Sequence, residues 1–237
     1  MFTYLLLCAL VGGGLGLKLP HYLVPCTRGD YPCMTSIAQK TLNGIIGGER
    51  KYDIPPLNPL ILPLVEIFGP AINISLTDLV IDGIQIGQIQ SAYINTEKQD
   101  GEVIIKFKKA HFVGNYDING RILIFSLQGA DKANITVENV IVTWKFNYKL
   151  FEKNGAKYAN ITKDVVDFRL DSAIIQLDEI IRGDPEMTKF TNQMLTRDWE
   201  IVIEELSIGI KEIISSVYKR VGNGFFLNFP IDVLLKP

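Results

Sequence analysis

The feature of this sequence that most restricts its fold is a change of hydrophobic period late in the chain. From Ile72 to Leu177, apolar and polar residues alternate in a series of segments, whereas from Pro185 onward apolar residues recur every three or four positions. Side chains alternate between the two faces of a strand, but return to one face of a helix about every 3.6 residues. The sequence therefore predicts a long β region followed by one long helix.

The segment from Val140 to Phe151 is the clearest of the predicted strands. Polar residues that would face water separate its large apolar side chains, which are Val142, Trp144, Phe146, Tyr148 and Leu150. All five lie on one face of a strand because the period is two. That face needs another element to cover it.

Turn signals divide the β region into antiparallel strands. Glycine or an Asx-glycine pair accepts the positive φ of tight hairpins, and such sites occur at Asp82-Gly83, Asp100-Gly101, Asn119-Gly120, Gly129 and Asn154-Gly155. Several segments between them exceed ten residues, which is longer than the usual strand. Long antiparallel strands favour one twisted, curved sheet over a compact sandwich.

The last third of the sequence predicts one amphipathic helix from Pro185 to about Val221. Asp184 before a proline is a start signal, and Gly222 to Gly224 are predicted to stop the helix. A helix of about thirty residues is roughly 45 Å long, enough to traverse an elongated domain. Its apolar stripe consists of Leu195, Trp199, Val202, Leu206, Ile210, Ile213, Val217 and Val221.

The region before the strands predicts a short helix and an extended connector. Apolar residues in the segment 34–48 have helical spacing, and Gly47-Gly48 is predicted to end that helix. Four prolines in residues 52–64 disfavour both a regular helix and a central strand there. No internal repeat or polar linker divides the chain, so residues 17–237 are predicted to form a single domain.

The amino terminus predicts export. Residues 1–16 read as a signal peptide, with an apolar block followed by Gly14 and Gly16 at the positions of a cleavage site; a membrane anchor is the alternative, although the block is too short to span. Removal of the signal leaves Cys26 and Cys33, which should form a disulfide in an oxidising compartment. Three sequons allow N-glycosylation, at Asn73, Asn134 and Asn160.

Composition and motifs argue against several functions. A net charge of −2 provides no basic field for nucleic acid or anionic membranes. Only His21 and His111 are available for histidine chemistry, and neither zinc-binding spacings nor a nucleophile elbow is present. The carboxylates Asp164, Asp167 and Asp171 are interpreted as the wet face of a strand. No enzyme activity, metal or cofactor is predicted.

Two features have both a functional and a structural interpretation. Arg28-Gly29-Asp30 inside a cysteine-closed loop has the form of an integrin ligand, but Gly29 would equally serve a turn. The apolar faces could form a filled core or line a ligand cavity, since ligand sites are also mostly aliphatic and aromatic. Composition alone does not separate these alternatives.

Five motifs in order along the chain resemble the insect takeout and juvenile-hormone-binding-protein family. They are the pair Cys26 and Cys33 followed by "IPPLNPLILP", "GNYDINGRILIFSLQGAD", "TNQMLTRDWEIVIEEL" and "FFLNFPIDVLL". The third motif departs from the family near Ser126 and Ala130, where a proline and a second glycine are common. The resemblance covers nearly the whole chain after the predicted signal.

The resemblance implies an α+β fold in which a long curved antiparallel sheet wraps a long carboxy-terminal helix, similar to one half of the lipid-binding proteins related to bactericidal permeability-increasing protein. It further implies a secreted carrier, in haemolymph or another extracellular fluid, with roles such as clock output, feeding and chemosensation. Such a carrier would be a monomer without stable membrane insertion, and a receptor would be a further partner. Its partner would be a juvenile-hormone-like isoprenoid or another long-chain lipid held in an apolar tunnel.

From this resemblance and the strand and helix periods, we predict the residues that line the tunnel. Tyr116 and Tyr148 are predicted polar contacts for an ester, epoxide or carbonyl group. The other predicted lining residues are Phe107, Phe112, Leu123, Phe125, Trp144, Phe146, Phe168, Trp199, Val202 and Leu206. A ligand-free extracellular interaction protein and a lipid-active enzyme are the alternative functions.

Overall fold

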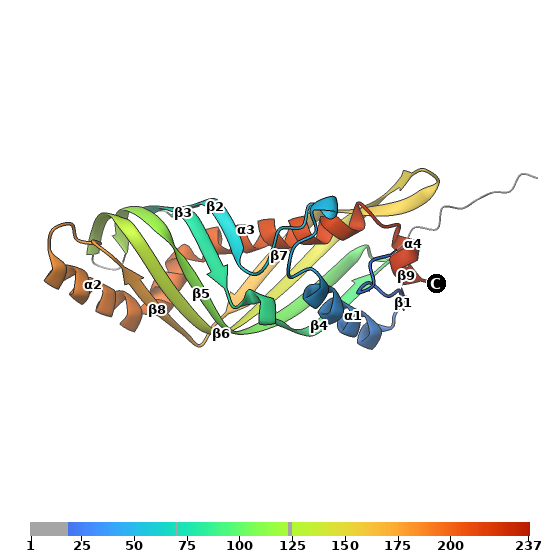
Figure 1. Cartoon of the computed structure of the whole chain (residues 1–237), viewed down its shortest axis with the longest axis horizontal. Coiled ribbons are helices and arrows are strands. Elements are labelled where there is room, and N and C mark those ends of the chain that lie inside the picture. The colour runs from blue at the N-terminus through green and yellow to red at the C-terminus, as the bar shows by residue number, and fades with distance from the viewer. Residues whose placement is uncertain (1–18, 70, 123–124) are drawn as a thin grey trace, which may run out of the picture.

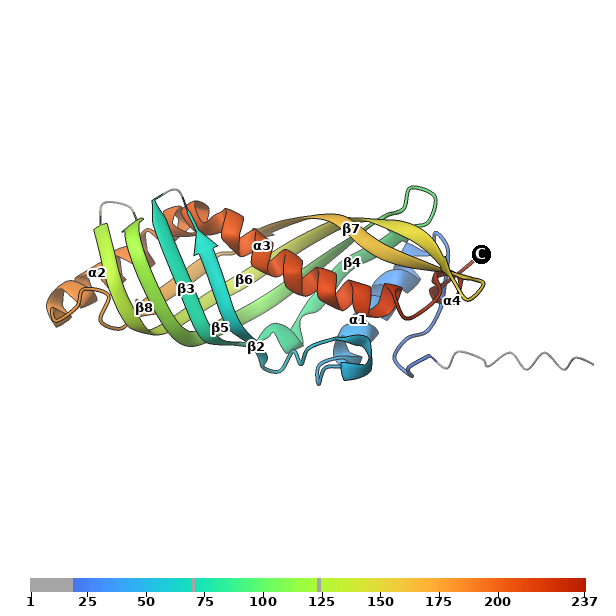
Figure 2. The same ribbon diagram turned by 90° about the horizontal axis from the view of Figure 1, so that it is seen from above.

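One curved antiparallel sheet and one long helix make up most of this elongated molecule (Figures 1 and 2). The computed structural model describes residues 19–69, 71–122 and 125–237. The expected signal peptide, residues 1–16, lies outside the described residues. The predicted fold class is confirmed.

The helices and strands have the following bounds. The helices are α1 (Tyr31–Gly44), α2 (Pro185–Arg197), α3 (Trp199–Phe226) and α4 (Ile231–Leu234), with 3-10 turns η1 (Arg50–Tyr52) and η2 (Ile84–Ile86). The strands are β1 (Cys26–Thr27), β2 (Leu60–Phe68), β3 (Ile72–Asp82), β4 (Gln88–Asn95), β5 (Asp100–Ile122), β6 (Phe125–Lys153), β7 (Ala156–Arg169), β8 (Ser172–Leu177) and β9 (Leu235–Lys236).

The two longest strands, β5 and β6, form the axis of the sheet. They pair from Asp100 opposite Asn147 to Ile122 opposite Phe125. Each is long enough to take different neighbours along its length: β5 pairs with β4 and then with β3, whereas β6 pairs with β8 and then with β7. Strand β2 pairs with β3 at the end of the seven-stranded sheet. The sheet thus has two halves joined by β5 and β6, and α3 runs along both (Figure 2).

The alternation from Val142 onward is confirmed. Val142, Trp144, Phe146 and Tyr148 are buried, while the intervening Lys145, Asn147 and Lys149 are exposed. The apolar face of β6 is covered in part by the end of α3, where Phe226 lies against Phe146 and Tyr148.

The predicted turns are only partly correct. Asn154 and Gly155 have positive φ and connect β6 to β7 as expected. Gly120 and Gly129 instead lie inside β5 and β6. At Gly120 a Cβ atom would lie 2.3 Å from the carbonyl oxygen of Ala71, and at Gly129 it would lie 2.7 Å from that of Glu179. These two glycines allow close approach of another backbone and do not form turns.

The predicted carboxy-terminal helix is divided into two helices. Asp184 caps the first as expected, since its side chain accepts a hydrogen bond from the Met187 amide. Asp198 separates α2 from α3, with φ −102° and ψ 30°. The predicted stop at Gly222 to Gly224 is wrong because α3 continues to Phe226. Gly222 instead lets the helix lie against Trp144 and Ile161, where a Cβ atom would approach side-chain atoms within 2.8 Å.

The amino-terminal predictions also shift. Helix α1 begins at Tyr31 and ends at Gly44, before the predicted Gly47-Gly48. The predicted connector contains the start of β2, with Pro63 inside that strand. A proline donates no backbone hydrogen bond, and β2 is an edge strand with a neighbour on one side only, so the missing donor is tolerated there.

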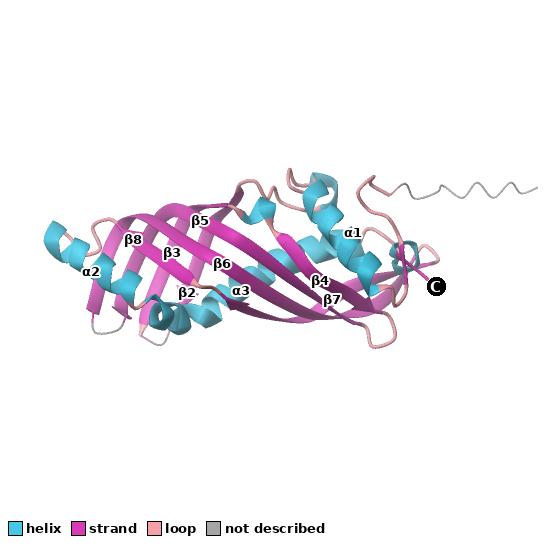
Figure 3. Ribbon diagram, turned by 90° about the horizontal axis from the view of Figure 1, so that it is seen from below, coloured by secondary structure: helices cyan, strands magenta, loops and turns pink. Residues whose placement is uncertain are grey.

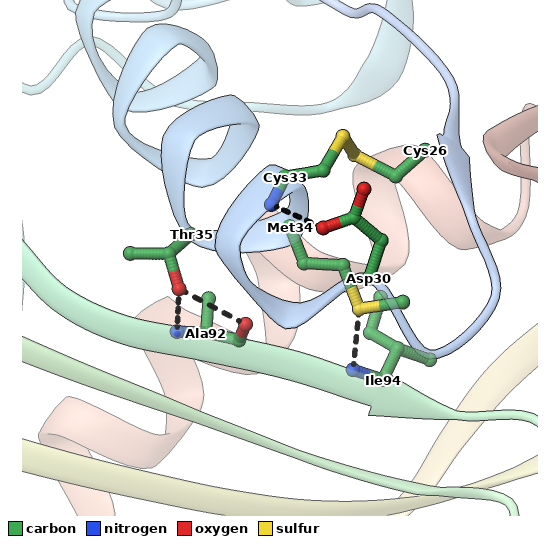
Figure 4. The surroundings of a disulfide bond; sticks show 7 residues. All are labelled: Cys26, Asp30, Cys33, Met34, Thr35, Ala92 and Ile94. Atoms are coloured by element: carbon green, nitrogen blue, oxygen red, sulfur yellow. Dashed lines mark hydrogen bonds between the residues drawn. A yellow bond between two sulfur atoms is a disulfide. The ribbon is translucent and has the colours of Figure 1, made fainter.

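The disulfide between Cys26 and Cys33 is confirmed, with a Cα–Cα distance of 5.8 Å (Figure 4). Cys33 lies in the first turn of α1, and Cys26 lies in β1, which pairs in parallel with β9 near the carboxy terminus. The Arg28 amide donates to the Lys236 carbonyl oxygen over 2.8 Å. The bridge therefore ties α1 to the point at which the two ends of the described chain meet.

Helices α1 and α2 lie along two edges of the sheet (Figure 3). They bond these edges through polar side chains. Along the free edge of β4, Thr35 of α1 accepts from the Ala92 amide and donates to the Ala92 carbonyl (Figure 4). Gln39, one turn further along α1, accepts from the Ile89 amide and donates to the Gly87 carbonyl. The side chains of α1 thus take the place of a neighbouring strand.

Candidate functional site

The first part of the candidate site is an aromatic cluster at the disulfide end of the sheet. It consists of Trp144, Phe146 and Tyr148 from β6 and Phe226 from the end of α3. The ring centroids of Trp144 and Phe146 are 4.4 Å apart, and Phe226 lies 5.8 to 5.9 Å from Phe146 and Tyr148. All four side chains are buried, so they form one continuous wall between the sheet and the helix.

The predicted lining residues divide between two hydrophobic clusters. Phe107 is buried together with the aromatic cluster, and Phe168 packs against it and is partly buried. A second cluster, toward α2, contains Tyr116 and Val202 with partly buried Phe112, Trp199 and Leu206. Leu123 and the side chain of Phe125 lie outside the described part of the chain. Sequence reasoning therefore found residues of the concave interior, but from both halves of the sheet.

The two tyrosines predicted as polar ligand contacts already donate hydrogen bonds within the protein. The Tyr148 hydroxyl donates to the Asn95 carbonyl oxygen over 3.0 Å, and the Tyr116 hydroxyl donates to the Asp178 carbonyl oxygen. Burial, together with nearby carboxylates, raises the pKa of each to about 12. Both hydroxyls are therefore neutral at physiological pH, and each already donates its one proton to a backbone carbonyl oxygen.

The middle of α3 carries apolar side chains that the sheet covers incompletely. Near its two ends, Val202, Gly224, Phe225 and Phe226 are buried, but between them Gly209 alone is buried among the described residues. The intervening apolar residues contact the hydrophobic clusters yet keep accessible surface; they are Leu206, Ile210, Ile213, Ile214, Val217, Tyr218 and Val221. Core positions of a helix are normally close-packed. The middle of α3 is therefore where an apolar molecule would gain most by filling space.

Tyr218, like Ile214, belongs to this stripe but was missed by sequence reasoning. It follows Ile210 and Ile214 at intervals of four, so it lies on the same face of α3. Its ring packs edge-on against Trp144, with centroids 5.7 Å apart and an interplanar angle of 89°. The signal available in the sequence was a hydroxyl-bearing aromatic residue at an apolar position of the predicted helix.

A polar stripe on α3 fastens the helix to β7. Its members recur every fourth residue: Lys211 pairs with Asp167 at 3.0 Å, and Lys219 pairs with Asp164 at 2.7 Å. Ser215, between the two lysines, donates to Asp164. Asn223, one turn after Lys219, accepts from the Ile161 amide over 2.9 Å. This side of α3 is therefore closed by hydrogen bonds and ion pairs.

The interpretation of the β7 carboxylates as a water-facing group is wrong for Asp164. Its side chain is only 4% exposed and faces inward, whereas Asp167 is 74% exposed. Burial by itself would raise the pKa of Asp164, but hydrogen bonds from Lys219, Ser215 and the Trp144 indole lower it below its ordinary value. The Trp144 Nε1–Asp164 Oδ2 distance is 3.0 Å. Asp164 therefore orients a wall residue of the aromatic cluster.

The Arg28-Gly29-Asp30 sequence has structural roles. Arg28 forms an ion pair with Asp232, Gly29 has a φ of 81°, and Asp30 caps α1 by accepting from the Cys33 amide over 3.0 Å. Both charged groups of the motif are engaged within the protein. The turn interpretation accounts for all three residues.

Two open hollows on the described part of the chain are lined mainly by polar residues. One shallow hollow lies on α3 around Ser215, Lys219 and Asn223, and another lies around Asn119, Gly120 and Arg121. Within the described residues, no three His, Cys, Asp or Glu side chains come together to hold a metal ion. None of the described helices has both the length and the apolar character needed to cross a membrane.

A family model and a solved structure agree with this fold. The family model described as haemolymph juvenile hormone binding protein matches residues 4–236. The crystal structure of Epiphyas postvittana Takeout 1 superposes with a TM-score of 0.80 at 22% identity, covering 90% of this chain and 99% of that one. A crystal structure of lipopolysaccharide binding protein gives a TM-score of 0.33 at 12% identity, covering 77% and 38% of the two chains. None of the curated proteins matches the chain.

Proposed function

Since the chain belongs to the haemolymph juvenile hormone binding protein family, we propose that it carries a small lipophilic molecule, bound non-covalently between α3 and the concave face of the sheet. The ligand class would be an isoprenoid or another long-chain lipid. The protein would be exported and act as an extracellular monomer, with its activity residing in binding and release and not in covalent chemistry.

The observation that carries this proposal is the incompletely covered apolar face of α3. The uncovered side chains extend from Leu206 to Val221, a span of about 22 Å along a helix. Such a strip suits an elongated apolar molecule better than a compact one. A ligand that removes on the order of 400 Å² of apolar surface from water would contribute about 10 kcal/mol before ordering costs.

The alternative of an adhesive interaction protein has little support. It relied on Arg28 and Asp30 being free to meet a receptor, and both are engaged in the described structure. The carrier proposal instead rests on the family match and on the incompletely covered apolar face of α3.

Organic extraction and mass spectrometry of the protein secreted from insect cells test the proposal directly. We expect a long-chain or isoprenoid molecule in stoichiometric amount, absent from mock-purified controls. The same preparation, after delipidation, should bind a neutral fluorescent probe such as N-phenyl-1-naphthylamine. A delipidated, folded protein that binds neither this probe nor any long-chain lipid at micromolar concentration would contradict the proposal.

Two isoleucines of α3 provide a matched pair of variants. Ile214 contacts the aromatic cluster, whereas Ile208 lies on the same helix with 70% of its surface exposed. We expect Ile214→Trp to reduce probe binding because the larger side chain occupies ligand space, and Ile208→Trp to leave it unchanged. Equal binding by both variants would place the probe elsewhere.

A further inference from the structure

The hydroxyl of Tyr218 differs from those of the two tyrosines that the sequence predicted as polar ligand contacts. Those of Tyr116 and Tyr148 donate to backbone carbonyl oxygens, but the Tyr218 hydroxyl makes no hydrogen bond with any described residue. A hydroxyl whose proton is not used within the protein can donate it to water or to a bound molecule. Tyr218 is therefore available as a donor, whereas Tyr116 and Tyr148 are not.

The unpaired hydroxyl is accessible. Sealed, unpartnered side-chain atoms do occur in this protein, such as the hydroxyl oxygen of Tyr22, but the oxygen of Tyr218 is not among those found in the described residues. The ring is held edge-on to Trp144, and the residue as a whole is partly buried. The ring is thus held in position, and its hydroxyl oxygen is not sealed within the protein.

The surroundings of this hydroxyl are apolar and uncharged. Burial raises the pKa of Tyr218 well above its ordinary range, and no neighbouring charge contributes to the shift. The nearest charged groups along α3, Lys219 and Arg220, are paired with Asp164 and Asp53. The environment therefore favours neutral partners and provides no free cation for an anionic one.

We propose that Tyr218 is a specificity-determining residue that donates a hydrogen bond to an acceptor oxygen of a bound neutral lipid, such as an ester, ether or ketone oxygen. This inference rests on the proposed carrier function and narrows its ligand class. Trp144 then serves as the platform that fixes the tyrosine ring, and Asp164 fixes Trp144. Hydrocarbons would gain only burial, and ionised acids would lose hydration without finding a counter-ion.

The test compares three ligands of similar length by displacement of N-phenyl-1-naphthylamine: methyl laurate, tetradecane and laurate anion. We expect Tyr218→Phe to lower the affinity for methyl laurate about 3- to 10-fold, which is the usual effect of one lost neutral hydrogen bond. Its affinity for tetradecane should stay unchanged. The wild-type protein should bind the ester more tightly than the anion.

Tyr148→Phe is the matched control, because its hydroxyl belongs to the same cluster but is committed to Asn95. It should change ester and hydrocarbon affinity by the same factor. Unchanged ester affinity in Tyr218→Phe, or tighter binding of the laurate anion than of the ester, would overturn the inference and leave the carrier proposal intact. Failure of the wild-type protein to bind any of the ligands or the probe would overturn both.

Discussion

A single inward-facing carboxylate, Asp164, connects the sheet, the helix and the aromatic cluster. It accepts hydrogen bonds from Trp144 on β6 and from Ser215 and Lys219 on α3. A buried charge is tolerated where hydrogen bonds satisfy its oxygens. Removing the Asp164 carboxylate leaves three donors without their acceptor. The loss of stability should therefore exceed that caused by removing an ordinary surface ion pair.

We expect Asp164→Asn to lower the free energy of unfolding by about 1–3 kcal/mol at pH 7. The pKa of Asp164 is lowered in the folded protein, so its contribution is complete above the unfolded value near 3.9 and is lost as pH falls through the folded pKa. The difference between wild type and variant in urea denaturation should therefore shrink below about pH 4.

Asp167→Asn is the control for this measurement. Asp167 lies on the same strand and also pairs with a lysine of α3, but its side chain is mostly exposed, so the substitution should have little effect on stability. Equal losses in the two variants, or a loss in Asp164→Asn that does not shrink as the pH falls below 4, would contradict the assignment.

At the scale of elements, the helices stabilise the sheet by completing its edges. Three residues of α2 at intervals of four, Thr188, Asn192 and Thr196, each bond both the amide and the carbonyl of one residue near β8. Their respective partners are Ile181, Leu177 and Ile175. The helix thus repeats on β8 what α1 does on β4. An unpaired edge would otherwise be available to other chains.

This arrangement predicts a local effect for Asn192→Leu. The Leu177 amide and carbonyl would lose their partners, and we expect stability to fall by about 1–3 kcal/mol because both groups are partly buried. Hydrogen exchange should show the Leu177 amide losing protection more than the amides of β5.

Gln193→Leu provides the comparison, since Gln193 is the next residue of α2 and is exposed. Its exchange pattern should match that of the wild-type protein. Loss of protection spread evenly over the sheet in Asn192→Leu would show that α2 does not act on the edge of β8 alone.

At the scale of the whole molecule, the outer face of the sheet carries exposed apolar residues beside two of the three sequons. Asn73 of β3 lies opposite Phe68, which is 69% exposed, and Asn134 of β6 lies opposite Val113, which is 47% exposed. Asn160 of β7 instead lies opposite Lys149. All three asparagines are exposed. Glycans at the first two positions would cover apolar surface.

The carrier proposal places the chain in the secretory pathway, where sequons meet the glycosylation machinery. We expect Asn73→Gln with Asn134→Gln to increase aggregation of the secreted protein, measured by light scattering at matched concentration. Asn160→Gln should behave like the wild type because a charged residue already lies opposite it. Peptide mass spectrometry that finds Asn73 and Asn134 unmodified in the soluble secreted protein would remove the basis of this prediction.

The sequence by itself determined the features that depend on local pattern. The alternation around Trp144, the helix start at Asp184 and the pair Cys26 and Cys33 were all readable, because strand pleat, helix capping and loop closure act over a few residues. The order of five motifs indicated the family. Periodicity also found residues of the interior in both halves of the sheet.

Only the tertiary structure decided which groups meet across the chain. Gly120 has the same local character as the turn residue Gly155, and its role depends on how closely β3 approaches it. Asp164 and Asp167 belong to one strand, but only the position of α3 makes the first a buried acceptor and leaves the second exposed. The unpaired hydroxyl of Tyr218 likewise depends on packing between residues more than seventy positions apart. Such distant pairings are set by the free energy of the whole fold, which no local period encodes.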